Sequence, residues 1–115
     1  MAAGVYNFIC EQGATFNRVI HATDASGDPI DLTDYTARMQ VRRDLDASDV
    51  LIELTTENDR ISLGGANGEI TLTIDAEDTS SIPRPGVYDL ELESDSGTVI
   101  RLLKGTFKLD SEVTR

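Results

Sequence analysis

The stretch GEITLTID, residues 68–75, alternates apolar and polar side chains at every second position. Because successive side chains of an extended chain point to opposite sides, Ile70, Leu72 and Ile74 share one face. One buried face and one solvated face are typical of a strand in an antiparallel sheet. The stretch therefore predicts a half-buried β-strand, and helical periodicity is nearly absent from the rest of the chain.

The same alternation recurs in three further stretches: TARMQVRR (36–43), VLIELTT (50–56) and VYDLELES (87–94). Turn-forming residues separate the strands in three segments: ASGDP (25–29), GGANG (64–68) and SDSG (94–97). SDSG is short enough for a tight hairpin. Residues 76–86 allow one helical turn at most, because Pro83 and Pro85 stop its continuation. Seven or eight short strands at this spacing predict a single all-β domain over residues 1–115, either a β-sandwich or a small barrel.

The formal charge is −11 over 115 residues, and it is unevenly distributed. Residues 44–98 carry fourteen acidic and two basic side chains, a net of −12, whereas residues 99–115 carry a net of +2. The acidic centre would repel a phosphate backbone, which disfavours direct nucleic-acid binding. No segment has the roughly 18 apolar residues that span a bilayer, and residues 1–10 lack the pattern of a signal peptide. We therefore expect a soluble protein that is made in a cytoplasm and does not bind membranes.

The chain offers few side chains for catalysis or metal binding. His21 is the only histidine, and no serine or cysteine pattern beside it resembles a nucleophile elbow. Cys10 is the only cysteine, and we interpret it as a small buried thiol. Two aspartate-rich segments, residues 24–34 and 44–49, do not fit the EF-hand calcium loop, and turn formation explains them better. We therefore predict no enzymatic activity, no metal, no cofactor and no small-molecule substrate.

The stretch TVIRLLKGTFKL, residues 98–109, differs from the other strands because it is apolar on both sides. Val99 and Leu103 share one parity, and Ile100 and Leu102 share the other. A strand that is apolar on both faces must be covered on both. The second cover is either the chain's own loops or another subunit.

This strand and one further apolar position define a candidate subunit interface. Leu51 is an apolar residue on an otherwise polar strand face. The four candidate interface residues are Leu51, Val99, Arg101 and Leu103. Gly105 predicts a β-bulge that re-aims the last strand. From these apolar positions we predict self-assembly into a ring or trimer. The charge layout fits, since the basic final segment of one copy could meet the acidic centre of the next.

An ordered set of stretches resembles small structural proteins of tailed phages and prophages. The set comprises QGATF (12–16), DASGDPIDLTDYTARMQVR (24–42), GEITLTIDAEDTSSIPRPGVYDLELES (68–94) and LLKGTFKLDSEVTR (102–115). In layout it is similar to the immunoglobulin-like N-terminal domain of phage baseplate upper proteins. The resemblance implies an antiparallel immunoglobulin-like β-sandwich and a location in the virion.

Two classes of function follow. The resemblance implies a non-enzymatic virion structural protein, a subunit of the tail, baseplate or head–tail connector. Such a subunit would act through symmetric self-assembly, as a ring or trimer within a phage tail or its attachment interface, and through contacts with other virion proteins. The alternative is a soluble immunoglobulin-like binding module, either an adhesin or a carbohydrate-binding domain. The lack of tryptophan and of a secretion signal weighs against this alternative.

Overall fold

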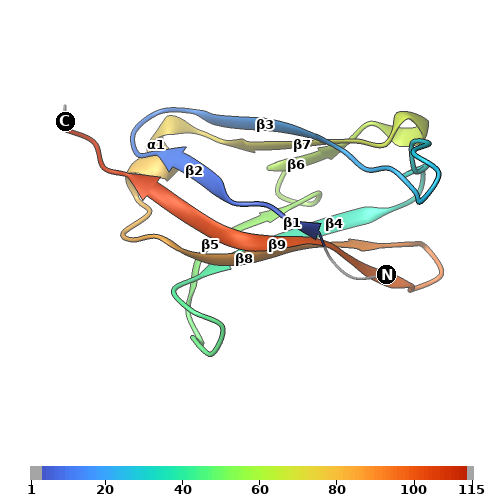
Figure 1. Cartoon of the computed structure of the whole chain (residues 1–115). Coiled ribbons are helices and arrows are strands. Elements are labelled where there is room, and N and C mark those ends of the chain that lie inside the picture. The colour runs from blue at the N-terminus through green and yellow to red at the C-terminus, as the bar shows by residue number, and fades with distance from the viewer. Residues whose placement is uncertain (1–3, 114–115) are drawn as a thin grey trace.

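The alternating stretches all form strands in a computed structural model of the chain, which describes residues 4–113 (Figure 1). The elements run in the order β1 (Gly4–Val5), β2 (Phe8–Glu11), β3 (Phe16–His21), β4 (Thr36–Arg42), β5 (Val50–Thr55), β6 (Ile61–Leu63), η1 (Gly65–Asn67), β7 (Glu69–Ile74), α1 (Ala76–Ser80), β8 (Gly86–Glu93) and β9 (Val99–Asp110). The helix α1 has five residues and ends before the two prolines, as the sequence predicted.

The strands form two sheets that pack face to face (Figure 1). The six-stranded sheet has the order β1-β9-β8-β4-β5, with β2 also paired to β9, and the three-stranded sheet has the order β3-β7-β6. The predicted all-β sandwich is therefore confirmed, and the small-barrel alternative is wrong. Pairing is antiparallel except that β1 and β2 run parallel to β9. No hairpin joins these strands to β9, so no turn imposes an antiparallel direction on them.

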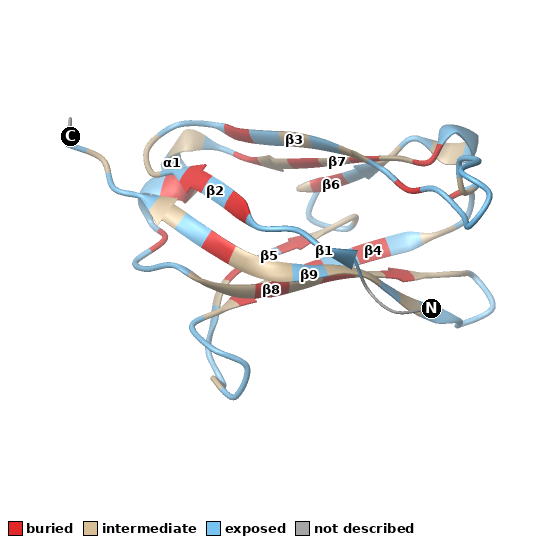
Figure 2. Cartoon of the chain, viewed as in Figure 1, coloured by how far each residue is buried: buried red, intermediate tan, exposed pale blue. Residues whose placement is uncertain are grey.

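The buried residues lie on strands of both sheets (Figure 2), and their side chains form one hydrophobic core. Phe8 belongs to this core, with ring centroids 5.7 Å from Phe16 and 5.1 Å from Tyr88. Such tilted and edge-to-face contacts add to the burial of apolar area. Aliphatic residues come from alternating positions of the strands: Ala37, Met39 and Val41 on β4, Ile52 and Leu54 on β5, Ile61 on β6, Ile70, Leu72 and Ile74 on β7, and Leu90 and Leu92 on β8.

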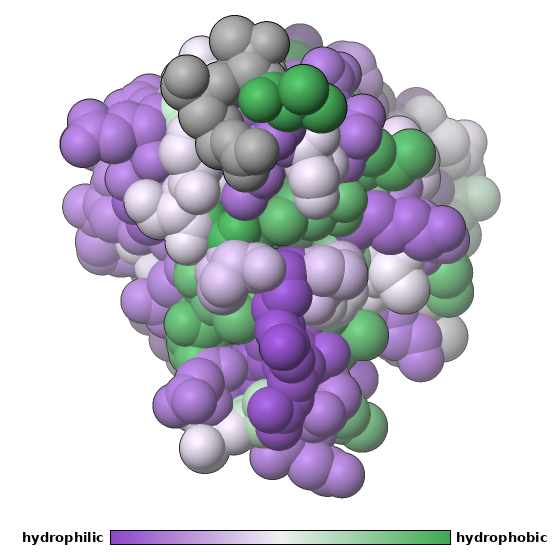
Figure 3. Space-filling model, turned by 90° about the vertical axis from the view of Figure 1, so that its left-hand side faces the viewer, coloured by the Kyte–Doolittle hydropathy of each residue, from purple (hydrophilic) through white to green (hydrophobic). Residues whose placement is uncertain are grey.

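Two connections fix the ends of the sandwich. The predicted SDSG hairpin joins β8 to β9, where the Gly97 amide donates to the Ser94 carbonyl over 3.0 Å. At the other end, Thr79 of α1 is fully buried, and its hydroxyl accepts a 3.0 Å hydrogen bond from the Gly13 amide. The same hydroxyl lies 2.9 Å from the Ala14 carbonyl oxygen. Figure 3 looks at this end of the molecule, whose surface is mostly hydrophilic.

The N-terminal segment runs alongside β9 and approaches it closely at Gly105, which does not mark the predicted bulge. The register shift between β8 and β9 falls at Leu102, which has no counterpart on β8. A Cβ atom at position 105 would overlap the carbonyl oxygen of Tyr6, so glycine is required there for close approach. The hydroxyl of Tyr88 donates a 2.6 Å hydrogen bond to the same carbonyl. Burial raises the pKa of Tyr88, so its hydroxyl stays protonated and remains a donor.

Candidate functional site on the outer face of the six-stranded sheet

The side of the six-stranded sheet that faces away from the three-stranded sheet is open to solvent, and we call it the outer face. Its charged residues are Glu11, Arg38, Arg42, Glu53, Asp89, Glu91, Glu93, Arg101, Lys104, Lys108 and Asp110. They comprise five basic and six acidic side chains, a net of −1. Because the whole chain carries −11, the remaining residues carry −10. The outer face is therefore nearly neutral on an acidic protein.

Ion pairs run across the strands of this face. The Arg38 guanidinium on β4 donates to the carboxylates of Glu91 (2.8 Å) and Glu93 (2.9 Å) on β8. These two bonds raise the pKa of Arg38. On β9, Arg101 lies 3.4 Å from the Asp89 carboxylate. Exposed pairs of this kind contribute about 0–1 kcal/mol each, so their main effect is a fixed pattern of alternating charge.

A cleft of about 710 Å³ opens on the outer face. Val87 of β8 and Thr106 of β9 line it, together with Val5 of β1 and Leu45 of the β4–β5 connection. We call residues 43–49 of this connection the 43–49 loop, and Figure 1 shows it projecting away from the sandwich. Leu45 is 89% exposed and Val5 is 71% exposed. The cleft therefore combines a polar, charged surface with two large apolar side chains in water.

Arg42 holds the 43–49 loop in place. Its guanidinium donates to the carbonyl oxygens of Ala47 (2.9 Å) and Ser48 (3.0 Å) and to the side chain of Gln40 (2.7 Å). Within the loop, the Asp44 carboxylate accepts the Asp46 amide over 3.1 Å. These bonds fix the loop backbone from both sides, so Leu45 is presented on a positioned turn.

The structure separates the four residues predicted as a subunit interface. Val99 and Arg101 lie on the outer face, where Val99 is 48% exposed and Arg101 lines the cleft. Leu103 pairs with the buried Leu90 and packs against the core, because the extra residue in β9 reverses the side-chain parity. Leu51 lies at a register shift in β5 and also packs against the core. The apolar inner side of β9 is thus covered by the chain's own second sheet.

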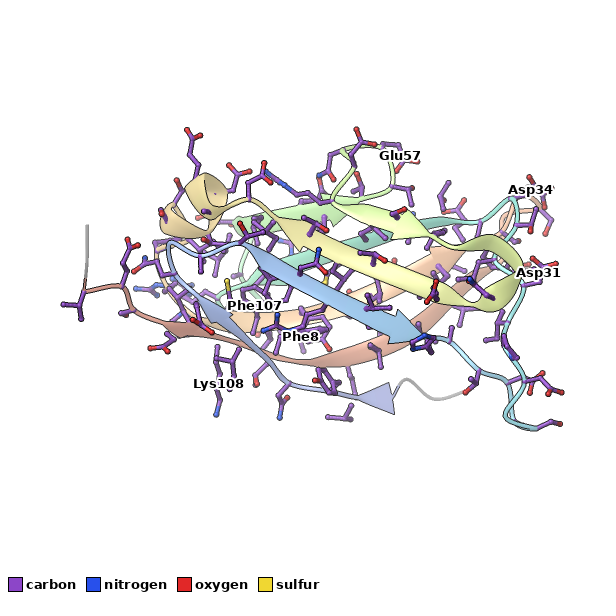
Figure 4. The ribbon with its side chains drawn as sticks, turned by 90° about the horizontal axis from the view of Figure 1, so that it is seen from above. Phe8, Asp31, Asp34, Glu57, Phe107 and Lys108 are labelled. Carbon is purple, nitrogen blue, oxygen red and sulfur yellow. The ribbon has the colours of Figure 1, made fainter. Side chains whose placement is uncertain are left out.

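The sequence reasoning missed Leu45 and Val5 as surface residues. Leu45 stands alone between Asp44 and Asp46 in a polar segment, and an isolated apolar residue in a turn was the available signal. Val5 gave no such signal, because the short parallel pairing of β1 with β9 sets its position. Figure 4 shows Lys108 pointing away from the sandwich, whereas Phe8 and Phe107 lie inside it.

His21 and Cys10, the two residues considered for catalysis, do not form a common site. His21 on β3 is exposed, and its Nε2 atom is 3.4 Å from the Glu69 carboxylate. Cys10 is buried as predicted, and burial raises the pKa of its thiol. Within residues 4–113, no three His, Cys, Asp or Glu side chains are grouped as metal ligands. In the same part of the chain, no helix is long and apolar enough to cross a membrane.

The aspartate-rich segments form turns, as predicted. The Asp24 carboxylate accepts the amides of Ser26 (2.9 Å) and Asp28 (3.1 Å). The Asp31 carboxylate accepts the hydroxyl (2.6 Å) and amide (3.0 Å) of Thr33, which lowers the pKa of Asp31. Asp31 and Asp34 lie at the end of the molecule opposite Lys108 (Figure 4).

Solved structures of other proteins share this architecture, whereas no family model and no curated protein sequence matches the chain. One is the crystal structure of ICOS in complex with ICOS-L and an anti-ICOS-L VNAR domain. The match has a TM-score of 0.54 and 12% identity, and covers 94% of this chain but only 56% of that one. The chain has an immunoglobulin-like fold. The predicted fold class is thereby confirmed.

A second solved structure aligns over most of both chains. It holds the extracellular domains of the voltage-gated sodium channel beta4 subunit, described as parallel homodimers. The alignment covers 98% of this chain and 97% of that chain, at 12% identity and a TM-score of 0.43.

Proposed function

We propose that this chain is a non-catalytic protein-binding module that binds its partner through the outer face of the six-stranded sheet. The cleft of about 710 Å³ on that face is the observation that carries the proposal. Protein interfaces combine exposed apolar side chains at their centre with a polar rim. Leu45 and Val5 supply the first, and the ion pairs of Arg38 and Arg101 supply the second.

The character of the outer face favours a protein over a sugar or a nucleic acid. Four of the six aromatic residues are buried in the core: Phe8, Phe16, Phe107 and Tyr88. They are therefore not available as stacking platforms for sugar rings. The acidic side chains of Asp89, Glu91 and Glu93 alternate with the basic ones, so the face is not the continuous basic surface that binds phosphates. The ICOS complex gives an example of this fold within a protein–protein complex.

The test is cross-linking from defined positions of the two sheets in the native host. The photoreactive residue p-benzoylphenylalanine would replace Val99 on the outer face or Val19 on the three-stranded sheet, which is 51% exposed. We expect covalent adducts with protein from position 99 and few from position 19. Adducts from position 19 alone would contradict the proposal, because the binding surface would then lie on the other sheet.

The more specific form of this proposal is a structural subunit in the virion of a tailed phage. It rests on the sequence resemblance carried by residues 24–42 and 68–94. In this role the outer face would bind a neighbouring virion protein, and the net charge of −11 would disfavour contact with packaged DNA. Mass spectrometry of purified virions would test the location, and absence of the protein from them would remove this form while leaving the binding module in place.

A further inference from the structure

The outer face carries both a projection and a hollow that differ in charge. The projection is the 43–49 loop, in which the exposed Leu45 lies between Asp44 and Asp46. The hollow is the cleft, where Val5 lies beside Lys104 and Arg101 of β9. Its charged lining comprises four basic side chains (Arg38, Arg42, Arg101 and Lys104) and three acidic ones (Asp44, Asp89 and Glu91). An apolar side chain flanked by two carboxylates thus lies on the same surface as a cleft whose lining has one more basic side chain than acidic ones.

We propose that the outer face binds a second copy of this chain, with the 43–49 loop of each copy seated in the cleft of the other. The inference rests on the proposed function, because it names the partner of the same site. A two-fold interface brings one patch against itself, so each contact occurs twice. A surface that bears both halves of a complementary pair meets this requirement. Leu45 fills the apolar part of the cleft, and Asp46 lies beside Lys104 of the other copy.

The distribution of charge favours this arrangement over contact through other surfaces. The strands of the outer face have a net charge of −1, the 43–49 loop adds −2, and the rest of the chain carries −8. Two copies joined through their outer faces keep most of the acidic residues outside the contact, where water and salt screen them. A specific interface buries about 800 Å² of each partner. This is roughly one-eighth of the chain's accessible surface of 6846 Å², an area that one face of a two-layer molecule can supply.

The first test compares two surface substitutions that each add one negative charge. Leu45→Asp changes the loop, and Val19→Asp changes the exposed side of the three-stranded sheet. Sedimentation equilibrium into the millimolar range would give the dimer dissociation constant, and circular dichroism would confirm that both variants fold. We expect Leu45→Asp to weaken the dimer at least about tenfold, which is the loss of one well-buried apolar contact per copy, and Val19→Asp to leave it unchanged. A wild-type protein that stays monomeric, or a dimer that Leu45→Asp does not weaken, would overturn the proposal.

The second test uses two charge reversals that are harmful alone and complementary together. Asp46→Lys places two lysines at each loop contact of its own homodimer, and Lys104→Glu places two carboxylates there. A mixed dimer of the two variants restores an opposite-charge pair at both contacts. We therefore expect each variant alone to dimerise more weakly than the wild type, and their mixture to recover wild-type affinity. A mixture that does not recover wild-type affinity would show that Asp46 and Lys104 do not meet across a two-fold axis. That result would contradict the proposed dimer.

The cross-linking experiment separates failure of this inference from failure of the proposed function. Adducts from position 99 to the chain itself support both. Adducts to a different protein, with a monomer in sedimentation, leave the binding module in place and exclude the second copy as its partner. The absence of adducts from position 99 contradicts both.

Discussion

The inner and outer faces of the six-stranded sheet are built from the same strands but differ in what stabilises their side chains. On β8, the inner residues Leu90 and Leu92 are buried, whereas the outer residues Glu91 and Glu93 bind Arg38 in water. The inner face is fixed by close packing against the second sheet. The outer face is held by exposed ion pairs, which contribute little to folding stability. The comparison indicates that packing on the inner face determines the fold, whereas the outer face contributes little to folding stability.

The comparison is tested most strongly at two neighbouring residues of β2. Phe8→Ala should destabilise the protein by about 3–5 kcal/mol, because it removes a buried ring that contacts Phe16 and Tyr88 and leaves a cavity. Ile9→Ala is the matched control on the outer face, where the side chain is 56% exposed. We expect the control to cost less than about 1 kcal/mol. Urea unfolding would measure both changes, and similar losses would show that the two faces do not differ as described.

The second test uses two residues of β9 that the sequence placed on one face. Leu103→Asp should cost about 2–3 kcal/mol, because it puts a carboxylate against the core and removes part of an apolar contact. Val99→Asp, on the other side of the extra residue at Leu102, should cost less than about 1 kcal/mol. Thermal unfolding would compare them. Equal effects would mean that the register shift does not reverse the side-chain parity.

This pair also shows where sequence reasoning reached its limit. The strands, the SDSG hairpin and the short helix before Pro83 followed from local patterns, because alternation and turn chemistry act over a few residues. The register shift at Leu102 depends on the pairing of β9 with β8, so no pattern in the local sequence predicts it. Gly105 was a misleading signal, because its small size serves the close approach of Tyr6 rather than a bulge. Val99 and Leu103 were therefore assigned to one face when they occupy two.

The parallel pairing of β1 with β9 could not be predicted from the sequence either. It joins Val5 to Lys104, which are separated by most of the chain, and no turn specifies it. The cleft depends on this pairing and on the path of the 43–49 loop. The sequence therefore predicted the sandwich but not the cleft on its outer face, since the cleft is assembled from segments whose relative positions are set by tertiary contacts.

A third test concerns Tyr88, whose hydroxyl reaches from the inner face to the N-terminal segment. Burial raises the folded-state pKa of Tyr88 above the value of about 10 in the unfolded chain. Its contribution to stability is fully present below about pH 10 and declines above it, because only the unfolded chain then releases the proton. The expected decline from this group is at most about 1.4 kcal/mol per pH unit.

Tyr88→Phe should remove that part of the decline and should cost about 1–2 kcal/mol at neutral pH, because the Tyr6 carbonyl loses its donor. Denaturant unfolding of both proteins between about pH 9 and pH 11 would measure the difference, since other groups titrate alike in both. Curves that stay parallel over this range would show that the hydroxyl ionises as easily in the folded protein as in the unfolded chain.

The smallest effect is expected at Thr106, which lies on the outer face but has a buried hydroxyl like a residue of the inner face. It is an outer-face residue that lines the cleft, yet its hydroxyl oxygen is buried without a hydrogen-bond partner among the described residues. A buried unpaired hydroxyl costs about 1–3 kcal/mol in protein mutational data. Thr106→Val keeps the branched shape and removes the hydroxyl, so it should stabilise the protein by about 1 kcal/mol and raise the melting temperature by roughly 4 °C.

The control for Thr106→Val is Thr73→Val on β7 of the three-stranded sheet, where the hydroxyl accepts a 3.4 Å hydrogen bond from Asn17. This change should leave the melting temperature nearly unchanged, because the side chain is only partly buried and its bond is long. Differential scanning calorimetry would compare the three proteins. A lower melting temperature for Thr106→Val than for the wild type would show that the hydroxyl is hydrogen-bonded in solution. It would place a donor, such as a bound water, on the floor of the cleft, where a partner side chain would have to displace it.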